Sequence, residues 1–205
     1  MITTIGYDQE EIISDILTLH AGGGPIDVDP TYSKGNFYKN SIKEPQFKFD
    51  IEPKYDFVTK ACATKLPLAP ASVKTIMFDP PFLATKGPSL KKAAGNKINK
   101  RFGVFETEPA LHAFYAKALG EFYRIAEPKG ILIFKCQDKV SSGKQYFSHC
   151  FVYEQARLAG WYAKDLFVLM AKNRIVANWQ RNQQHARKFH SYFWVFQKMH
   201  KNLCI

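Results

Sequence analysis

Residues 75–87, TIMFDPPFLATKG, place a carboxylate, two prolines and an aromatic ring directly after a short apolar strand. Asp79 supplies a carboxylate acceptor. Pro80 and Pro81 stiffen the backbone and remove two N–H donors, so the carbonyl groups beside them are free to accept. Phe82 adds a flat apolar face for stacking. An exocyclic amino group on a nucleobase needs these features, because its two hydrogens must be held while its ring is stacked. The four residues are therefore the candidate catalytic site.

Helices and strands around these residues would position them. Apolar residues recur at helical spacing in three segments, residues 8–20, 107–126 and 145–159. Asp8 is the expected N-cap of the first helix. Strands are expected at residues 26–29, 47–50, 75–78, 131–135, 162–171 and 191–198. This alternation predicts an α/β fold, a single domain of residues 1–205 with a mostly parallel sheet and helices on both faces. The last two strands lack a clear crossover helix, which predicts an antiparallel strand near the C-terminus.

Four acids lie at or just after the ends of expected strands, namely Asp29, Asp50, Asp79 and Asp138. Ligands of open α/β sheets bind beyond the carboxyl ends of the strands. Like charges repel, so four acids at one edge would not be expected from stability alone. They are explained if they face ligand hydroxyls, amines or a cation. The histidines and cysteines do not have the spacing of zinc ligands, so no metal site is expected.

The charge of the chain is uneven. The net charge is +11 and the pI about 9.4, yet residues 1–30 contain six acids and no Lys or Arg. This indicates an anionic partner, with nucleic acid favoured over a membrane. The four cysteines form no CxxC pair, and the sequence has no signal peptide and no apolar run of membrane-spanning length. These features predict a cytoplasmic protein with free thiols and no membrane partner.

Two basic, acid-poor insertions are expected near residues 86–106 and 171–190. The first follows the candidate catalytic strand, and the second joins the last two strands. We expect these stretches to contact a phosphate backbone, although solvated loops would have the same composition. The candidate nucleic-acid-binding residues are Lys86, Lys91, Lys92, Lys97, Arg101, Arg174, Arg181 and Arg187.

The DPPF stretch resembles the (D/N)PP(Y/F/W) motif of class I S-adenosylmethionine-dependent amino-methyltransferases, especially those acting on adenine N6 or cytosine N4 in nucleic acid. Upstream, DVDPTYSKGNFY at residues 27–38 is similar to the first motif of that family, D-P-x-x-G-x-G-x-F. The matching residues are Asp29, Pro30, Gly35, Asn36 and Phe37. Ser33 stands where the family has its first glycine. The resemblance is specific in residues 27–82 and covers residues 12–196 at the level of the fold.

The resemblance implies a Rossmann-like class I methyltransferase fold and S-adenosylmethionine as the cofactor. Asp50 resembles the acid that holds the cofactor ribose, and Cys62 stands where an acid usually contacts the adenine amine. The implied cofactor-binding residues are Asp29, Pro30, Thr31, Gly35, Asn36, Phe37, Asp50, Cys62 and Asp79, and the implied catalytic residues are Asp79, Pro80, Pro81 and Phe82. A base inside a duplex would have to be flipped out before it reached them.

The leading expectation is methyl transfer to an exocyclic amine of a DNA base, with adenine N6 favoured over cytosine N4. The alternatives are an RNA base amino-methyltransferase acting on guanine N2 or adenine N6, and a catalytically inactive nucleic-acid-binding relative. Ser33 and Cys62 are the departures that motivate the inactive alternative. No stretch is long enough for a separate target-recognition domain. This predicts relaxed sequence preference or recognition by a separate specificity subunit, and a homodimer is also open.

Overall fold

The computed structural model describes residues 1–82, 84, 105–141, 143–171 and 185–199. The described helices are α1 (Gln9–His20), α4 (Glu108–Ile125) and α5 (Ser148–Leu158). The described strands are β1 (Ile5–Gly6), β2 (Val28–Asp29), β3 (Phe47–Asp50), β4 (Thr59–Lys60), β5 (Val73–Phe78), β6 (Ala126–Cys136), β7 (Lys139–Ser141), β8 (Lys144–Tyr146), β9 (Trp161–Met170) and β10 (His190–Lys198). None of the helices in these ranges combines the length and apolar character that crossing a bilayer needs.

Eight strands form one sheet in the order β1-β9-β10-β6-β5-β2-β3-β4. Strand β10 is antiparallel to both of its neighbours, β9 and β6, whereas the other neighbouring pairs are parallel. The expected mostly parallel sheet with an antiparallel strand near the C-terminus is therefore confirmed. Strands β7 and β8 form a separate hairpin after the end of β6.

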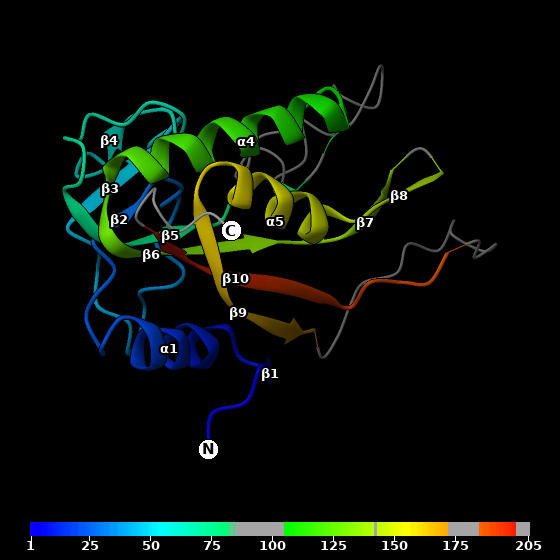
Figure 1. The fold of residues 1–205 in the computed structure, drawn as a ribbon, viewed down its shortest axis with the longest axis horizontal. Coiled ribbons are helices and arrows are strands. Elements are labelled where there is room, and N and C mark those ends of the chain that lie inside the picture. Colours follow the sequence, from blue (N-terminus) through cyan, green and yellow to red (C-terminus); the bar gives the residue numbers. More distant parts are fainter. Residues whose placement is uncertain (83, 85–104, 142, 172–184, 200–205) are drawn as a thin grey trace.

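Helices cover both faces of the sheet, as expected (Figure 1), with α4 and α5 on one side and α1 on the other. The side chains of β6 divide between the two faces in alternation. Leu132 and Phe134 belong to the core that includes Phe122 of α4. Ile131 and Ile133 belong to the second core, which contains the apolar side of α1.

Helix α1 begins as the sequence predicts, because the Asp8 carboxylate accepts the backbone N–H groups of Glu10 and Glu11 at 2.8 and 3.0 Å. Helix α5, in contrast, begins at Ser148 rather than at the expected residue 145. Residues 144–146 pair with residues 139–141 instead, and Gly143 turns this hairpin with a φ of 74°. The expected helix is therefore shorter, because its first residues form strand β8.

The strand ends bring the candidate residues to one edge of the sheet. Asp29 ends β2, Asp50 ends β3, and Asp79 directly follows β5. Strand β2 lies between β3 and β5, which makes these three ends neighbours. The connections at residues 30–46 and 51–58 contain no helix, so loops rather than helices surround this part of the edge.

Candidate functional site

The turn at residues 79–82 is held by side chains from α4 and from the β7–β8 hairpin. The Tyr115 hydroxyl donates to the Pro81 carbonyl oxygen at 2.6 Å, and the Lys139 ammonium donates to the Phe82 carbonyl oxygen. Lys139 also forms an ion pair with Glu108 at 2.9 Å, where both side chains are largely buried. Two carbonyl groups of the turn are therefore fixed by protein donors, which holds the backbone of residues 81 and 82 in place.

The backbone of Asp79 is tied to the loop that follows β2. Its N–H donates to the Thr31 hydroxyl oxygen at 2.9 Å, and this hydroxyl donates to Asp29 Oδ1 at 3.1 Å. The Asp79 carboxylate lies 3.5 Å from Lys135 Nζ on β6. The structure thus brings Asp29, Thr31 and Asp79 together, as the sequence predicts for neighbouring strand ends.

Asp29 is almost completely buried, with an exposed fraction of 1%. Its Oδ1 accepts the Thr31 N–H at 2.8 Å as well as the hydroxyl, and its Oδ2 accepts the Tyr38 hydroxyl at 2.8 Å. Burial raises the pKa of Asp29 to about 7, although the hydrogen bonds from Tyr38 and Thr31 oppose this rise. The carboxylate thus fixes the loop at residues 30–38, and a direct contact with a cofactor stays a prediction.

This buried carboxylate predicts a specific pH dependence of stability. The folded-state pKa of Asp29 lies above its ordinary value of 3.8, so the folded protein binds a proton that the unfolded chain has lost. The associated stability is present at low pH and is lost as the pH rises from about 4 to about 7. Urea denaturation of wild type and Asp29→Asn should therefore show a difference in the free energy of unfolding that changes by on the order of 2 kcal/mol between pH 5 and 7. The exposed control Asp56→Asn should follow wild type, and a difference constant with pH would contradict the prediction.

The loop at residues 32–38 is a compact aromatic turn. Tyr32 stacks on Tyr38 at 5.7 Å between ring centroids, and its hydroxyl donates to the Glu44 carboxylate. Ser33 and Gly35 both have positive φ, at 51° and 62°. Ser33 therefore adopts the left-handed conformation at the position where the resembling family has glycine. Its N–H donates to Asp50 Oδ2 at 2.9 Å, which joins this loop to the end of β3.

The two positive-φ residues predict a large and a small response to substitution. A Cβ on Gly35 would overlap the hydroxyl oxygen and the ring of Tyr32. Gly35→Ala should therefore lower the free energy of unfolding by about 2 kcal/mol or more, because the contact adds to the cost of left-handed backbone. Ser33→Gly, the matched control, should change it by about 0.5 kcal/mol or less, since relief of strain offsets the added chain entropy. Urea denaturation checks both, and a neutral Gly35→Ala would mean that the loop rearranges freely.

The remaining residues implied to bind a cofactor lie around the same edge. Pro30 and Phe37 are buried and Asn36 is exposed. Asp50 also accepts the Glu52 N–H at 2.8 Å through Oδ1. Cys62 is half-buried, with its sulfur 3.2 Å from the Thr64 hydroxyl oxygen. Their contacts with a cofactor stay predictions.

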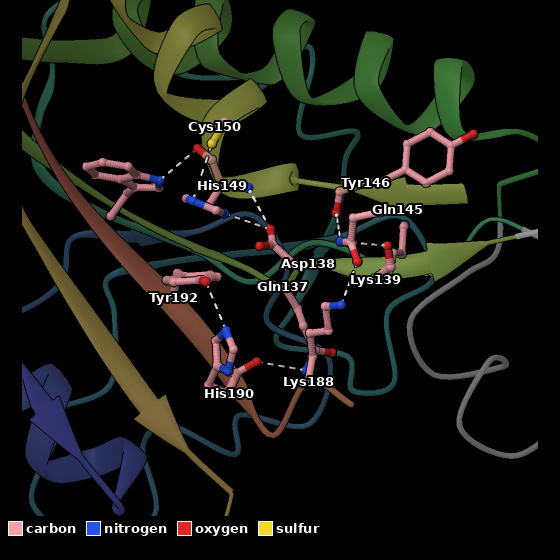
Figure 2. A network of polar contacts seen from close by, with 11 residues as sticks. Gln137, Asp138, Lys139, Gln145, Tyr146, His149, Cys150, Lys188, His190 and Tyr192 are labelled. Atoms are coloured by element: carbon pink, nitrogen blue, oxygen red, sulfur yellow. Dashed lines mark hydrogen bonds and ion pairs between the residues drawn. The ribbon is translucent and has the colours of Figure 1, made fainter. Parts of the chain in front are cut away.

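A polar network that the sequence did not predict lies between the end of β6 and the start of β10 (Figure 2). Asp138, exposed by 4%, accepts the His149 backbone N–H and lies 2.8 Å from His149 Nδ1. The His149 ring stacks on Tyr192 at 4.4 Å, and burial together with the nearby Asp138 raises the pKa of Tyr192 to about 12. His190 Nε2 lies 2.9 Å from the Tyr192 hydroxyl oxygen. The sequence identifies Asp138 as an acid near the end of a strand. Its partner, His149, comes after the β7–β8 hairpin, whose short strands show no hydrophobic periodicity.

The same network reaches the second basic stretch. The Lys188 ammonium donates to Gln145 Oε1 of the hairpin at 2.5 Å, and Arg187 beside it is half-buried. The other candidate nucleic-acid-binding residues, Lys86, Lys91, Lys92, Lys97, Arg101, Arg174 and Arg181, lie outside the described residues. Within the described ranges, no group of three or more His, Cys, Asp or Glu could hold a metal ion.

Comparison of the sequence with protein-family models and with curated proteins gave no match. Comparison with solved structures found the cyclase SpnF, with 12% identity, coverage of 95% of this chain and 84% of that one, and a TM-score of 0.54. It also found an S-adenosylmethionine-dependent methyltransferase of Leishmania major, with 13% identity, coverage of 91% and 70%, and a TM-score of 0.52.

A proposed DNA modification methylase of Thermus thermophilus, in complex with S-adenosylmethionine, has 16% identity, coverage of 68% of this chain and 54% of that one, and a TM-score of 0.48. The present chain thus spans about half the length of that methylase. At these identities the likenesses show the fold, and this chain has the mostly parallel Rossmann-like fold of class I S-adenosylmethionine-dependent methyltransferases.

Proposed function

We propose that this protein transfers the methyl group of S-adenosylmethionine to an exocyclic amino group of a DNA base, with adenine N6 favoured over cytosine N4. The observation that carries the proposal is the fixed turn at residues 79–82 at the carboxyl-end edge of a methyltransferase-type sheet. A carboxylate, a rigid carbonyl and an aromatic ring are there held beside the loop at residues 30–37. This is the arrangement that methylation of a ring-bound amine requires.

The residues at this edge fit the proposed cofactor. The loop at residues 30–37 lies at this edge and is held in a fixed shape, since the Tyr32 side chain packs against Gly35 and the Ser33 N–H donates to Asp50. Asp50 adds a carboxylate at the end of β3, where ribose hydroxyls could donate to it. Bound there, S-adenosylmethionine supplies a methyl group on a positively charged sulfur.

The chain's own residues would then prepare the target amine. Asp79 and the Pro80 carbonyl oxygen accept its two hydrogens, which directs the nitrogen lone pair toward the methyl group. Phe82 stacks on the base and fixes its plane. When the nitrogen–carbon bond forms and the sulfur–carbon bond breaks, the nitrogen must lose one proton, and the Asp79 carboxylate passes that proton to water. Most of the acceleration comes from alignment and electrostatics rather than from a covalent intermediate.

Charge supports nucleic acid as the substrate class. The chain has a net charge of +11, and all of its Lys and Arg residues come after residue 30. The first 30 residues contain acids but no Lys or Arg. Arg187 and Lys188 lead from the second basic stretch into β10, and Lys188 contacts the hairpin that holds the turn. A phosphate backbone bound by these cations would lie beside the hairpin that contacts the turn at residues 79–82.

The test is incubation of the purified protein with methyl-labelled S-adenosylmethionine and either unmethylated DNA or RNA, followed by nucleoside analysis. We expect label in N6-methyladenine from DNA, and none with the Asp79→Ala variant. Label in N4-methylcytosine would correct the base, and label in RNA alone would replace DNA by RNA as the substrate. Bound S-adenosylmethionine with no label in either nucleic acid would overturn the proposal.

A further inference from the structure

Lys135 near the end of β6 lies inside a cage of aromatic rings. Its Nζ atom is 5.3, 5.9 and 5.5 Å from the ring centroids of Phe37, Phe82 and Phe193. These distances are within the range of cation–π attraction. The Lys135 side chain is exposed by only 12%, so its positive charge depends on these rings and on polar neighbours rather than on bulk water.

Two polar groups complete this cage. Asp79 Oδ2 lies 3.5 Å from Lys135 Nζ, and Gln9 Oε1 on the first turn of α1 accepts from Nζ at 2.6 Å. Three rings and a carboxylate around one ammonium form a cation site. Two of its members, Phe37 and Phe82, come from the loop and the turn between which the proposed reaction takes place.

We propose that the three rings and Asp79 form the subsite for the sulfonium group of S-adenosylmethionine, and that Lys135 occupies it in the cofactor-free protein. The inference rests on the proposed function, because it concerns the same site. The methyl group must lie next to the amine that Asp79 and Phe82 hold, and its positively charged sulfur therefore falls among the groups that now surround Lys135. Two cations at this distance repel one another, so the ammonium has to leave when the sulfonium binds.

The side chain of Lys135 is suited to this exchange. A lysine ammonium is a compact charge on a flexible four-carbon stem, so it can withdraw while its backbone stays in β6. Gln9 lies on a helix anchored by its own cap and apolar side, and it offers an acceptor that does not belong to the turn. The alternative role of Lys135 is to hold Asp79 in place for catalysis, which predicts the opposite effect of its removal on cofactor affinity.

The test is calorimetric titration of wild type and Lys135→Met with S-adenosylmethionine and with S-adenosylhomocysteine, its neutral thioether product. Removing the competing ammonium should tighten S-adenosylmethionine binding and should raise its preference over S-adenosylhomocysteine by about tenfold. Lys135→Arg keeps the charge and should keep the wild-type preference. Lys164→Met, an exposed change on β9, is the matched control and should leave both affinities unchanged.

Unchanged or weaker S-adenosylmethionine binding by Lys135→Met would overturn the inference and assign Lys135 to the positioning of Asp79. Lys135→Gln is a second neutral variant. It repeats the comparison if thermal unfolding shows that Lys135→Met is not folded. If wild type binds S-adenosylmethionine but Lys135→Met has the wild-type preference over S-adenosylhomocysteine, the cation subsite is overturned and the proposed function stands. If wild type binds neither compound, both are overturned.

Discussion

Asp79→Ala is expected to lower the rate of methyl transfer by about 10²- to 10³-fold, the effect of losing one preorganised electrostatic group in an active site. Its carboxylate would otherwise hold one hydrogen of the amine and receive the proton that the nitrogen loses. Asp79→Asn should retain more activity, because an amide oxygen still accepts the hydrogen bond although it cannot take the proton. Single-turnover methyl transfer at saturating cofactor measures this effect separately from binding.

Affinity for S-adenosylmethionine should change by only about threefold or less in Asp79→Ala. In the cofactor-free protein the same carboxylate attracts the Lys135 ammonium at 3.5 Å, so its removal weakens the competing cation as well as the sulfonium. The exposed Asp56→Ala is the control for an arbitrary loss of negative charge. Wild-type turnover by Asp79→Ala would show that the assignment of the DPPF motif is wrong.

Local signals were sufficient to predict the long elements and the edge at which the site lies. Strand β3 occupies residues 47–50 as expected, and α1 begins after its Asp8 cap. Asp29, Asp50 and Asp79 gather at one edge because parallel strands end together, which follows from topology without any knowledge of side-chain positions. Burial patterns with a period of two or 3.6 are read directly from such segments.

Short elements were not predictable, because two or three residues cannot display a period. Strands β1 and β4 have two residues each, and the end of strand β8 overlaps the expected start of a helix at residue 145. The consequence for the site is direct. Lys139 is on the β7–β8 hairpin, and its contact with the Phe82 carbonyl spans 57 residues of sequence.

Side-chain partners across the fold were likewise outside the reach of sequence patterns. Tyr115 reads as one more apolar residue of α4, yet its hydroxyl fixes the Pro81 carbonyl. Glu108 reads as an ordinary acid of a first helical turn, yet it is the buried partner of Lys139. Lys135 is the last residue of the expected strand at residues 131–135, and only the fold shows that three aromatic rings surround it. Tyr115 and the Lys139–Glu108 pair thus hold the turn at residues 79–82.

The buried ion pair between Lys139 and Glu108 predicts the largest loss of stability. Burial lowers the pKa of Lys139 and its hydrogen bond with Glu108 opposes this, so each charge depends on the other. Lys139→Met would leave the Glu108 carboxylate buried without its cation and should lower the free energy of unfolding by about 3–5 kcal/mol. The double variant Lys139→Met/Glu108→Gln should recover a large part of that loss, because no unpaired charge remains. Urea denaturation of both variants measures the coupling between the two residues.

A matched surface pair separates this effect from the mere loss of a lysine. Lys54 lies 3.6 Å from Glu52, whose side chain is 74% exposed, so Lys54→Met should cost about 0.5 kcal/mol or less. A loss as small for Lys139→Met would mean that water reaches Glu108. The double variant should still transfer methyl groups about tenfold more slowly than wild type despite its recovered stability, because the Phe82 carbonyl has lost its donor and the stacking ring is less precisely held. The double variant should therefore recover stability without recovering the rate of methyl transfer. Recovery of both would mean that Lys139 contributes to stability alone.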